Sequence, residues 1–173
     1  MFKIILRLSQ RLARKVKSNE LADIMLDQNP CADWSCRLFV ARRAEYVLVS
    51  NTTSMYSCVF PSVEITDSDR LSSGLLDAMG KFMLADEQEA SLRQLDAAAV
   101  TGIMFAKPLD RFMAVSMSDH VHSAKLYLAD GMKPHEIGLR LNSTRMALRT
   151  HSRRRHFVKP RDVFMDLMVA RPQ

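Results

Sequence analysis

The sequence has little glycine and no long hydrophobic run, and these absences exclude several classes of protein. Only five glycines occur among 173 residues, and none forms a glycine-rich loop that could cradle a phosphate. A nucleophile elbow of the G-x-S-x-G type is also absent. Uninterrupted apolar runs are a few residues long, whereas a bilayer span needs about 20. The sequence therefore contains no nucleotide loop, hydrolase elbow or membrane span.

Cysteine is scarce and is not arranged for metal or redox chemistry. Cys31, Cys36 and Cys58 are odd in number and include no C-x-x-C pair, so we expect structural free thiols. The opening apolar residues lead into basic residues instead of a small-residue cleavage site. These features predict a cytoplasmic protein.

His120 and His122 are the nearest approach to a metal motif. They stand two positions apart, beside Asp119. On a helix such positions point in nearly opposite directions, so they cannot hold one ion from the same face. We therefore expect neither a metal nor an organic cofactor.

Positive charge is concentrated near both ends of the chain. Residues 1–17 carry six basic side chains and no acidic one, and residues 140–161 are also free of acid. The basic residues of the second segment are Arg140, Arg145, Arg149, Arg153, Arg154, Arg155, Lys159 and Arg161. Acidic residues outnumber basic ones between these segments. This separation favours an anionic partner or self-complementary association.

The pattern of apolar residues predicts a sheet. Alternation over Asp33–Pro61, with polar breaks at Arg42–Glu45 and Asn51–Ser54, indicates three consecutive antiparallel strands. Phe2–Leu8 and Ala98–Lys107 are rich in residues that favour strands and supply two more. We therefore predict about five strands.

Helical patterns occupy most of the remaining chain. The expected helices are a short one after Ser9, one capped by Thr66 or Asp67, Glu89–Leu95, Val115–Asp130 ending at Gly131, Pro134–Leu141, Arg145–His151 and one from Pro160. No repeat or linker divides the chain. The prediction is a single α+β domain over residues 1–173, with a mainly antiparallel sheet of about five strands. We expect its helices on one face and a helical, basic C-terminal third.

Four stretches together resemble a family of small bacterial proteins known only as a domain of unknown function. They are Asp33-Trp34 followed by Leu38-Phe39, VLVSNTTSMYSCVFP, AKPLDRFMAVSMSDHVHSAKLYL, and LNSTRMAL. The resemblance implies an α+β fold and a bacterial source, without an activity or catalytic residues. The chain departs from the family pattern at Arg145, where a proline is usual, and in its basic SRRRH.

A second, local resemblance is to a helix-turn-helix of the resolvase or transposase type. It covers AKLYLADGMKPHEIGLRLNSTRMALRTHSRRR, in which Thr144–Ser152 would be the recognition helix. Asn142 would then take a left-handed turn. Such a helix would offer side chains to a major groove, with neighbouring arginines on phosphates. The nucleic-acid-binding residues that this implies are Thr144, Arg145, Arg149, Arg153, Arg154 and Arg155.

Two polar residues leave another interpretation open. Ser143 and Ser152 stand where this motif normally has apolar residues that lock the recognition helix. The alternative is a helical hairpin followed by a solvated basic loop. We predict a non-enzymatic binding protein with nucleic acid or another polyanion as its partner, and its N-terminal helix as a second contact surface. A protein-interaction or homo-oligomeric module is the main alternative, and a cryptic hydrolase is the third.

Overall fold

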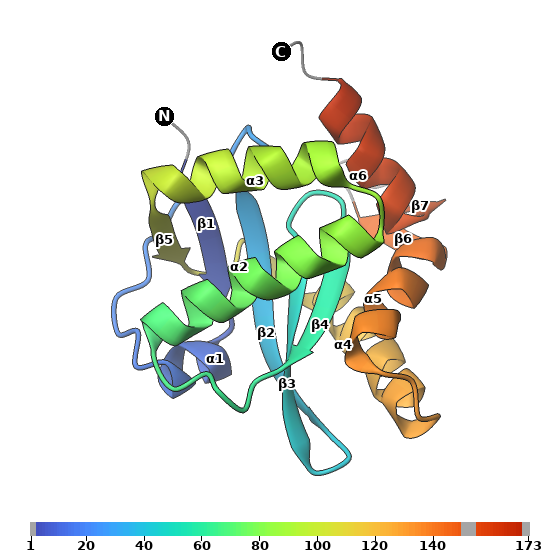
Figure 1. Ribbon diagram of the computed structural model, residues 1–173, viewed down its shortest axis with the longest axis horizontal. Coiled ribbons are helices and arrows are strands. Elements are labelled where there is room, and N and C mark those ends of the chain that lie inside the picture. The colour runs from blue at the N-terminus through green and yellow to red at the C-terminus, as the bar shows by residue number, and fades with distance from the viewer. Residues whose placement is uncertain (1–2, 150–154, 171–173) are drawn as a thin grey trace.

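The computed structural model describes residues 3–149 and 155–170 (Figure 1). Its elements in chain order are β1 (Ile4–Leu8), α1 (Gln10–Lys15), β2 (Asp33–Ala41), β3 (Ala44–Asn51), β4 (Ser57–Pro61), α2 (Ser68–Ala85), α3 (Glu89–Thr101), β5 (Ile103–Ala106), α4 (Arg111–Ala129), α5 (Pro134–Ser143), β6 (Met146–Arg149), β7 (Arg155–Val158) and α6 (Pro160–Val169). The predicted α+β class is confirmed.

The main sheet is mixed, with strand order β4-β3-β2-β1-β5. The predicted three-stranded antiparallel unit is present as β2, β3 and β4. However, β1 is parallel to both of its neighbours, β2 and β5, so the expectation of a mainly antiparallel sheet is only partly correct. A parallel neighbour needs a crossover. Here α1 and the segment 16–32 provide the crossover from β1 to β2.

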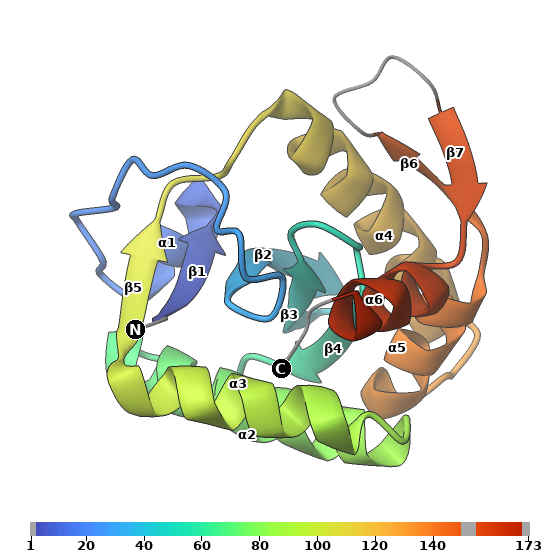
Figure 2. The same cartoon turned by 90° about the horizontal axis from the view of Figure 1, so that it is seen from above.

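Helices cover both faces of the sheet, and the expectation of one covered face is wrong. α2 and α3 lie on one side, α4 lies on the other, and α5 lies beside β4 at the edge (Figure 2). The central strands require both layers, because the consecutive residues Val47, Leu48 and Val49 are all fully buried. Since successive strand residues point to opposite faces, each face has its own apolar core.

Several helix ends follow the predicted local signals. The Ser9 hydroxyl accepts a hydrogen bond from the Leu12 amide at the start of α1, and Asp67 caps α2 through the Arg70 amide. Gly131 has φ +88° directly after α4, a left-handed conformation that favours glycine.

The boundary between α3 and β5 differs from the prediction. Ala98–Thr101 belongs to α3, and the strand is restricted to Ile103–Ala106. Alanine is the strongest helix former, so the helix continues through the alanines until Gly102. That glycine has φ +119°, which ends the helix and turns the chain into β5.

Helix α5 closes the β4 edge of the sheet. The Asn142 side chain accepts a hydrogen bond from the Ser57 amide at 2.7 Å and donates one to the Ser57 carbonyl at 2.9 Å. Gly138 permits this approach, since a Cβ there would lie 2.6 Å from the Phe82 ring. Asn142 is thus a buried helical residue, and its predicted role as a left-handed turn is wrong.

Helix α6 packs against the core through one aromatic side chain. Phe164 is fully buried and stacks on Tyr56 with ring centroids 4.4 Å apart. Arg161 forms an ion pair with Asp86 at 3.0 Å, and the Tyr56 hydroxyl donates to the same carboxylate. Burial and this hydrogen bond raise the pKa of Tyr56. Together these contacts fix α6 to the β4–α2 side of the molecule.

We expect the Phe164→Ala substitution to lower the free energy of unfolding by about 3–5 kcal/mol, because it leaves a cavity beside Tyr56. Chemical denaturation measures this change. Val169→Ala is the matched control on the same helix, since Val169 is 83 % exposed, and it should leave stability unchanged. Equal effects of the two substitutions would contradict the packing role assigned to Phe164.

Candidate functional site

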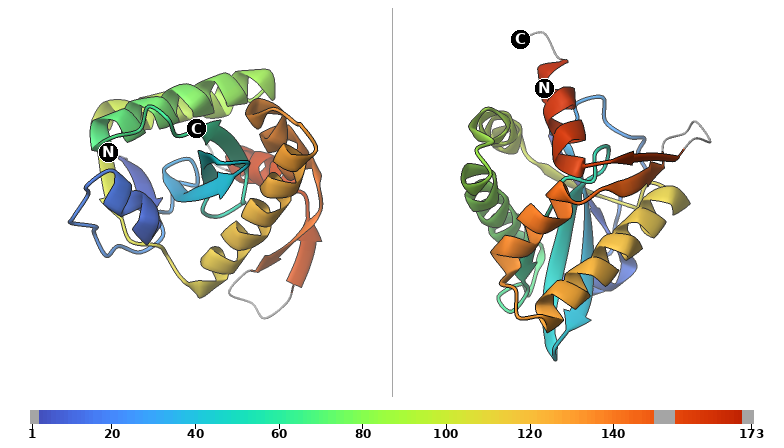
Figure 3. Two further views of the ribbon diagram at one scale, coloured as in Figure 1. Left: turned by 90° about the horizontal axis from the view of Figure 1, so that it is seen from below. Right: turned by 90° about the vertical axis from the view of Figure 1, so that its right-hand side faces the viewer.

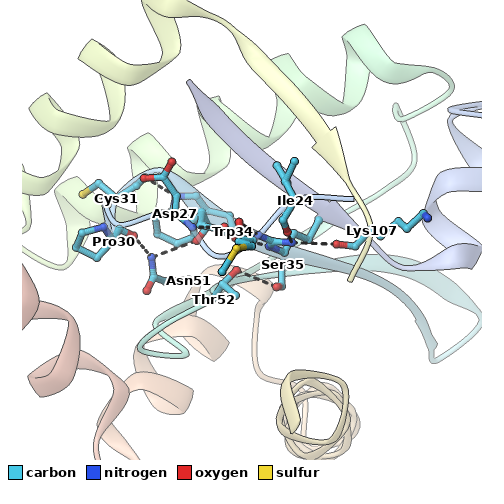
Figure 4. Close-up of polar contacts among 12 residues, drawn as sticks. Ile24, Asp27, Pro30, Cys31, Trp34, Ser35, Asn51, Thr52 and Lys107 are labelled. Carbon is cyan, nitrogen blue, oxygen red and sulfur yellow. Dashed lines mark hydrogen bonds and ion pairs between the residues drawn. The ribbon is translucent and has the colours of Figure 1, made fainter. Parts of the chain in front are cut away.

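A buried ion pair lies at the centre of the sheet. The Arg7 guanidinium of β1 binds both carboxylate oxygens of Asp33 on β2, with each distance 2.8 Å. Its remaining N–H groups donate to three backbone carbonyls, those of Ile24, Met25 and Lys107 (Figure 4). All five donors of the arginine are therefore satisfied, as a buried guanidinium requires.

This arginine holds an irregular segment against the sheet. The segment 16–32 makes one isolated bridge, between Ala22 and Ala106 of β5, within the described residues. Asp33 also accepts a hydrogen bond from the Asp27 amide at 3.2 Å. The Arg7–Asp33 pair thus attaches the segment that lies over β1 and β5, where α4 does not reach (Figure 2).

The same polar cluster positions the turn between β3 and β4. The Asn51 amide donates to the carbonyls of Pro30 and Asp33, and its oxygen accepts from the amide and hydroxyl of Ser54. Met55 is fully buried with φ +64°, a left-handed conformation rare for such a side chain. Asn51 therefore connects the turn to the chain at Pro30 and Asp33.

A small cavity opens beside this turn. It has a volume of about 140 Å³ and lies between the turn, the first turns of α4, Leu26 of the irregular segment and Leu148 of β6. Its lining residues are Leu26, Thr52, Thr53, Met55, Leu109, Asp110, Phe112, Met113, Ser116 and Leu148. The Thr52 hydroxyl pairs with that of Ser35 at 2.9 Å, which ties the cavity wall to β2. The cavity combines apolar walls with a few polar groups, as small-ligand sites do.

Ser57 and His120 form a buried pair that is unsuited to nucleophilic catalysis. The Ser57 hydroxyl lies 3.0 Å from Nδ1 of His120 and also donates to the Met55 carbonyl. Ser57 is fully buried, so a substrate cannot reach its oxygen. Burial lowers the pKa of His120 to about 4, and the histidine is neutral at pH 7. His122 is exposed on the other side of α4, which confirms that the two histidines do not share a face.

The predicted recognition helix is wrong. Thr144 is the C-terminal cap of α5, and its hydroxyl donates to the Arg140 carbonyl. Arg145 follows as an exposed residue. Arg149 ends strand β6, where the register pairs it with Arg155 of β7. Arg153 and Arg154 lie outside the described residues.

An alternation of apolar residues could have revealed the strand. Met146 and Leu148 stand two positions apart and pack against the core beside α4. This period belongs to a strand and not to a helix. The resulting β6–β7 hairpin extends away from the main sheet (Figure 3).

Three basic side chains of the N-terminal segment are paired with acidic residues within the protein, so less of its positive charge is available to a partner. Arg7 is paired internally, and both Arg11 and Lys15 bind Glu45, at 3.2 and 2.6 Å. The Lys15 hydrogen bond lowers the pKa of Glu45. The C-terminal arginines are therefore the stronger candidates for contact with an anion.

A family model for a domain of unknown function, DUF6933, matches residues 5–163. The chain belongs to this family. No curated protein and no solved structure matches the chain. The expected membership of an uncharacterised family is thus confirmed.

DUF6933 membership assigns no chemistry to the site. Asp33 and Trp34, quoted above for the family resemblance, are both buried in the polar cluster. Trp34 donates to the Cys31 carbonyl at 2.7 Å. The three cysteines are buried, and burial raises the pKa of Cys58 to about 12. These residues hold the scaffold together.

Two kinds of feature are absent from residues 3–149 and 155–170 of this DUF6933 protein. None of the helices there combines the length and apolar character needed to cross a membrane. The same residues contain no group of three or more histidine, cysteine or acidic side chains that could hold a metal ion.

We expect Asp33→Asn to lower the free energy of unfolding by about 3–5 kcal/mol, because it leaves the buried Arg7 charge without its counter-ion. Equilibrium denaturation measures the loss. The matched control is Asp23→Asn, whose exposed ion pair with Lys107 spans 3.5 Å and should contribute at most about 1 kcal/mol. A loss no larger for Asp33 than for Asp23 would refute the central role of the pair.

Acidification should destabilise the protein through His120. Its pKa is about 4 when folded against about 6.5 when unfolded, so the unfolded chain takes up the proton first. The stability due to neutral His120 is complete above about pH 6.5 and is lost as the pH falls toward 4, by up to about 3 kcal/mol.

Denaturation at several pH values tests this, and His120→Gln should flatten the profile in that range. The exposed His122 serves as the control through His122→Gln, which should preserve the slope. A profile that His120→Gln leaves unchanged would contradict the assignment.

Proposed function

We propose that this protein is a non-enzymatic nucleic-acid-binding protein that contacts phosphates through the segment 140–161. The observation that carries the proposal is the β6–β7 hairpin. Its register places Arg149 opposite Arg155, and the segment contains no acidic residue. Basic residues in a segment without acidic ones produce a field that attracts phosphates. Two-stranded ribbons are among the elements that dock on nucleic acids.

The hairpin replaces the recognition helix as the contact element. Arg155 begins β7, and Arg153 and Arg154 precede it in the sequence, outside the described residues. Arg145 precedes β6 and is exposed. Arg161 is the exception in this segment, because it is engaged by Asp86 at the start of α6.

The absence of catalysis and the cellular location are parts of the same proposal. The groups with strongly shifted pKa values, Tyr56, Cys36, Cys58 and His120, are all buried. Buried Cys36 and Cys58 thiols suit a reducing compartment. We therefore extend the proposal to a cytoplasmic protein of bacterial origin.

The salt dependence of binding tests the proposal. If the segment contacts about five phosphates, log affinity should fall against log salt with a slope of about −4.5 on duplex DNA and about −3.5 on a single strand. Replacement of Arg153, Arg154 and Arg155 by alanine should weaken binding to all sequences alike and flatten the slope by up to about 3. Fluorescence anisotropy measures both quantities.

The control variant removes the same charge elsewhere. Arg70, Lys81 and Arg93 are exposed on α2 and α3, so their replacement by alanine should leave the slope nearly unchanged. Equal losses of affinity in the two triple variants would show that binding depends on net charge alone. Absence of binding at low salt would contradict the proposal.

That negative result would favour the second candidate, a homo-oligomeric or protein-interaction module. One observation supports it. In the described residues, the isolated bridge at Ala22 covers the outer edge of β5 at Ala106 only, and a strand edge with unpaired groups is a site for association. Sedimentation would then show a dimer at micromolar concentration.

A further inference from the structure

The chain leaves the neighbouring parallel strands β1 and β5 toward opposite faces of the sheet. After β1 it enters α1, whose Leu12 and Val16 lie in the core shared with α2 and α3. After β5 it enters α4, whose Met113 and Met117 lie in the core of the other face. Such a topological switch point leaves a crevice beyond the carboxyl ends of the two strands, and open sheets of parallel strands bind their ligands there.

A crevice of about 1050 Å³ lies at this place. It is lined by Leu8, the last residue of β1, by Phe105 of β5, and by Lys107 and Pro108, which follow β5. We call it the β1–β5 crevice. Small-ligand sites have volumes of roughly 300–1,000 Å³, so this crevice is large enough for a metabolite-sized molecule.

The wall that follows β5 is fixed in place by its backbone. The Lys107 amide donates to the Ala22 carbonyl at 2.9 Å, and the Ala22 amide donates to the Phe105 carbonyl at 3.0 Å. The Lys107 carbonyl accepts a hydrogen bond from the Arg7 guanidinium at 3.2 Å (Figure 4). The segment 16–32 and the central ion pair therefore both position the residue that carries the Lys107 ammonium group.

Two cationic side chains line the β1–β5 crevice from different elements, Arg14 from α1 and Lys107 from the residue after β5. Arg14 takes part in none of the ion pairs formed among residues 3–149 and 155–170, whereas the other two basic side chains of α1 bind Glu45. Lys107 lies 3.5 Å from the carboxylate of Asp23, and both of these side chains are exposed, so solvent screens the contact. Both cations are therefore available to an acid group of a ligand.

Apolar side chains form another part of the lining, among them Met104, Phe105 and Pro108. They provide a surface for the apolar body of a ligand. The lining also contains the exposed carboxylate of Glu20. This charge opposes ligands with more than one negative charge, such as phosphate monoesters, which carry nearly two at neutral pH. A carboxylic acid carries a single negative charge and suits this combination better.

From these observations we propose that the β1–β5 crevice binds a small carboxylic acid with an apolar body. Arg14 and Lys107 bind the carboxylate, and the apolar body lies on Met104 and Phe105. This site is separate from the segment 140–161. The inference therefore goes beyond the proposed function, and its tests use no nucleic acid.

Phenylacetate is the probe for the site, and neutral phenylacetamide is a control of nearly the same shape. The chain contains 12 methionines. With ¹³C-labelled methionine methyl groups, phenylacetate should shift the NMR signal of Met104, which lines the crevice, and phenylacetamide should bind more weakly. Met55 and Met113 line the cavity beside the β3–β4 turn, and Met25 lines a neighbouring cavity that Met104 also borders. The signals of these three should not move.

Substitutions of the charged residues test the contacts with the carboxylate. Arg14→Ala and Lys107→Ala should each weaken phenylacetate binding about 1.5- to 5-fold, as the loss of an exposed ion pair does. The double variant should bind phenylacetate and phenylacetamide equally. Arg11→Ala is the matched control, because it removes the same charge from α1 at a residue outside the lining, and it should leave the affinity nearly unchanged. Glu20→Gln should strengthen binding, because it removes a repulsive charge.

Several results would overturn the inference. A Met104 signal that stays unmoved at millimolar phenylacetate, or that moves together with the signal of Met25, would contradict binding in the β1–β5 crevice. Equal weakening by Arg11→Ala and Arg14→Ala would show an effect of net charge alone. Tighter binding of phenyl phosphate than of phenylacetate would overturn the carboxylic acid class. The same holds for tighter binding of phenylalanine that Glu20→Gln abolishes, since the ligand would then be an amino acid.

Discussion

The buried contact between Arg7 and Asp33 is the constraint on which the rest of the fold depends. It joins two parallel strands whose sequence positions are 26 apart, and it also holds the irregular segment that covers one half of a sheet face. A charge at this depth is tolerated only with every hydrogen bond made. The backbone carbonyl of Asp33 accepts a hydrogen bond from Asn51, and Asn51 in turn orders the turn beside the cavity. One ion pair therefore links sheet, covering segment and candidate site.

Local signals were sufficient to predict most elements of the fold. The alternation in Asp33–Pro61 specified three strands, and Ser9, Asp67 and Gly131 marked helix ends because caps act over three or four residues. The position of β1 beside β2 and β5 depends on pairing between distant segments. The two-sided burial of Val47–Val49 was visible as an unbroken apolar run, which is typical of a strand covered on both faces.

The candidate site was less accessible to prediction. Arg7 belongs to a stretch of basic residues, and only its pairing with Asp33 separates it from its neighbours. The cavity is assembled from four segments that are remote in sequence, so no sequence motif indicates it. The Thr144 side chain could cap the start of a helix, but in the structure Thr144 caps the end of α5. A local resemblance to a helix-turn-helix therefore could not decide between a helix and the strand indicated by Met146 and Leu148.

The contact between Asn142 and Ser57 limits how copies of the protein can aggregate. A side-chain amide offers one donor and one acceptor, as a neighbouring strand does, and α5 lies against the rest of β4. Among the described residues, the main sheet is thereby left with one edge that another chain could extend, the part of β5 that the bridge at Ala22 does not cover. Edge-to-edge growth into a fibre needs two open edges on every molecule. Pairing through this sheet must stop when two copies meet, so the largest assembly that it allows is a closed dimer.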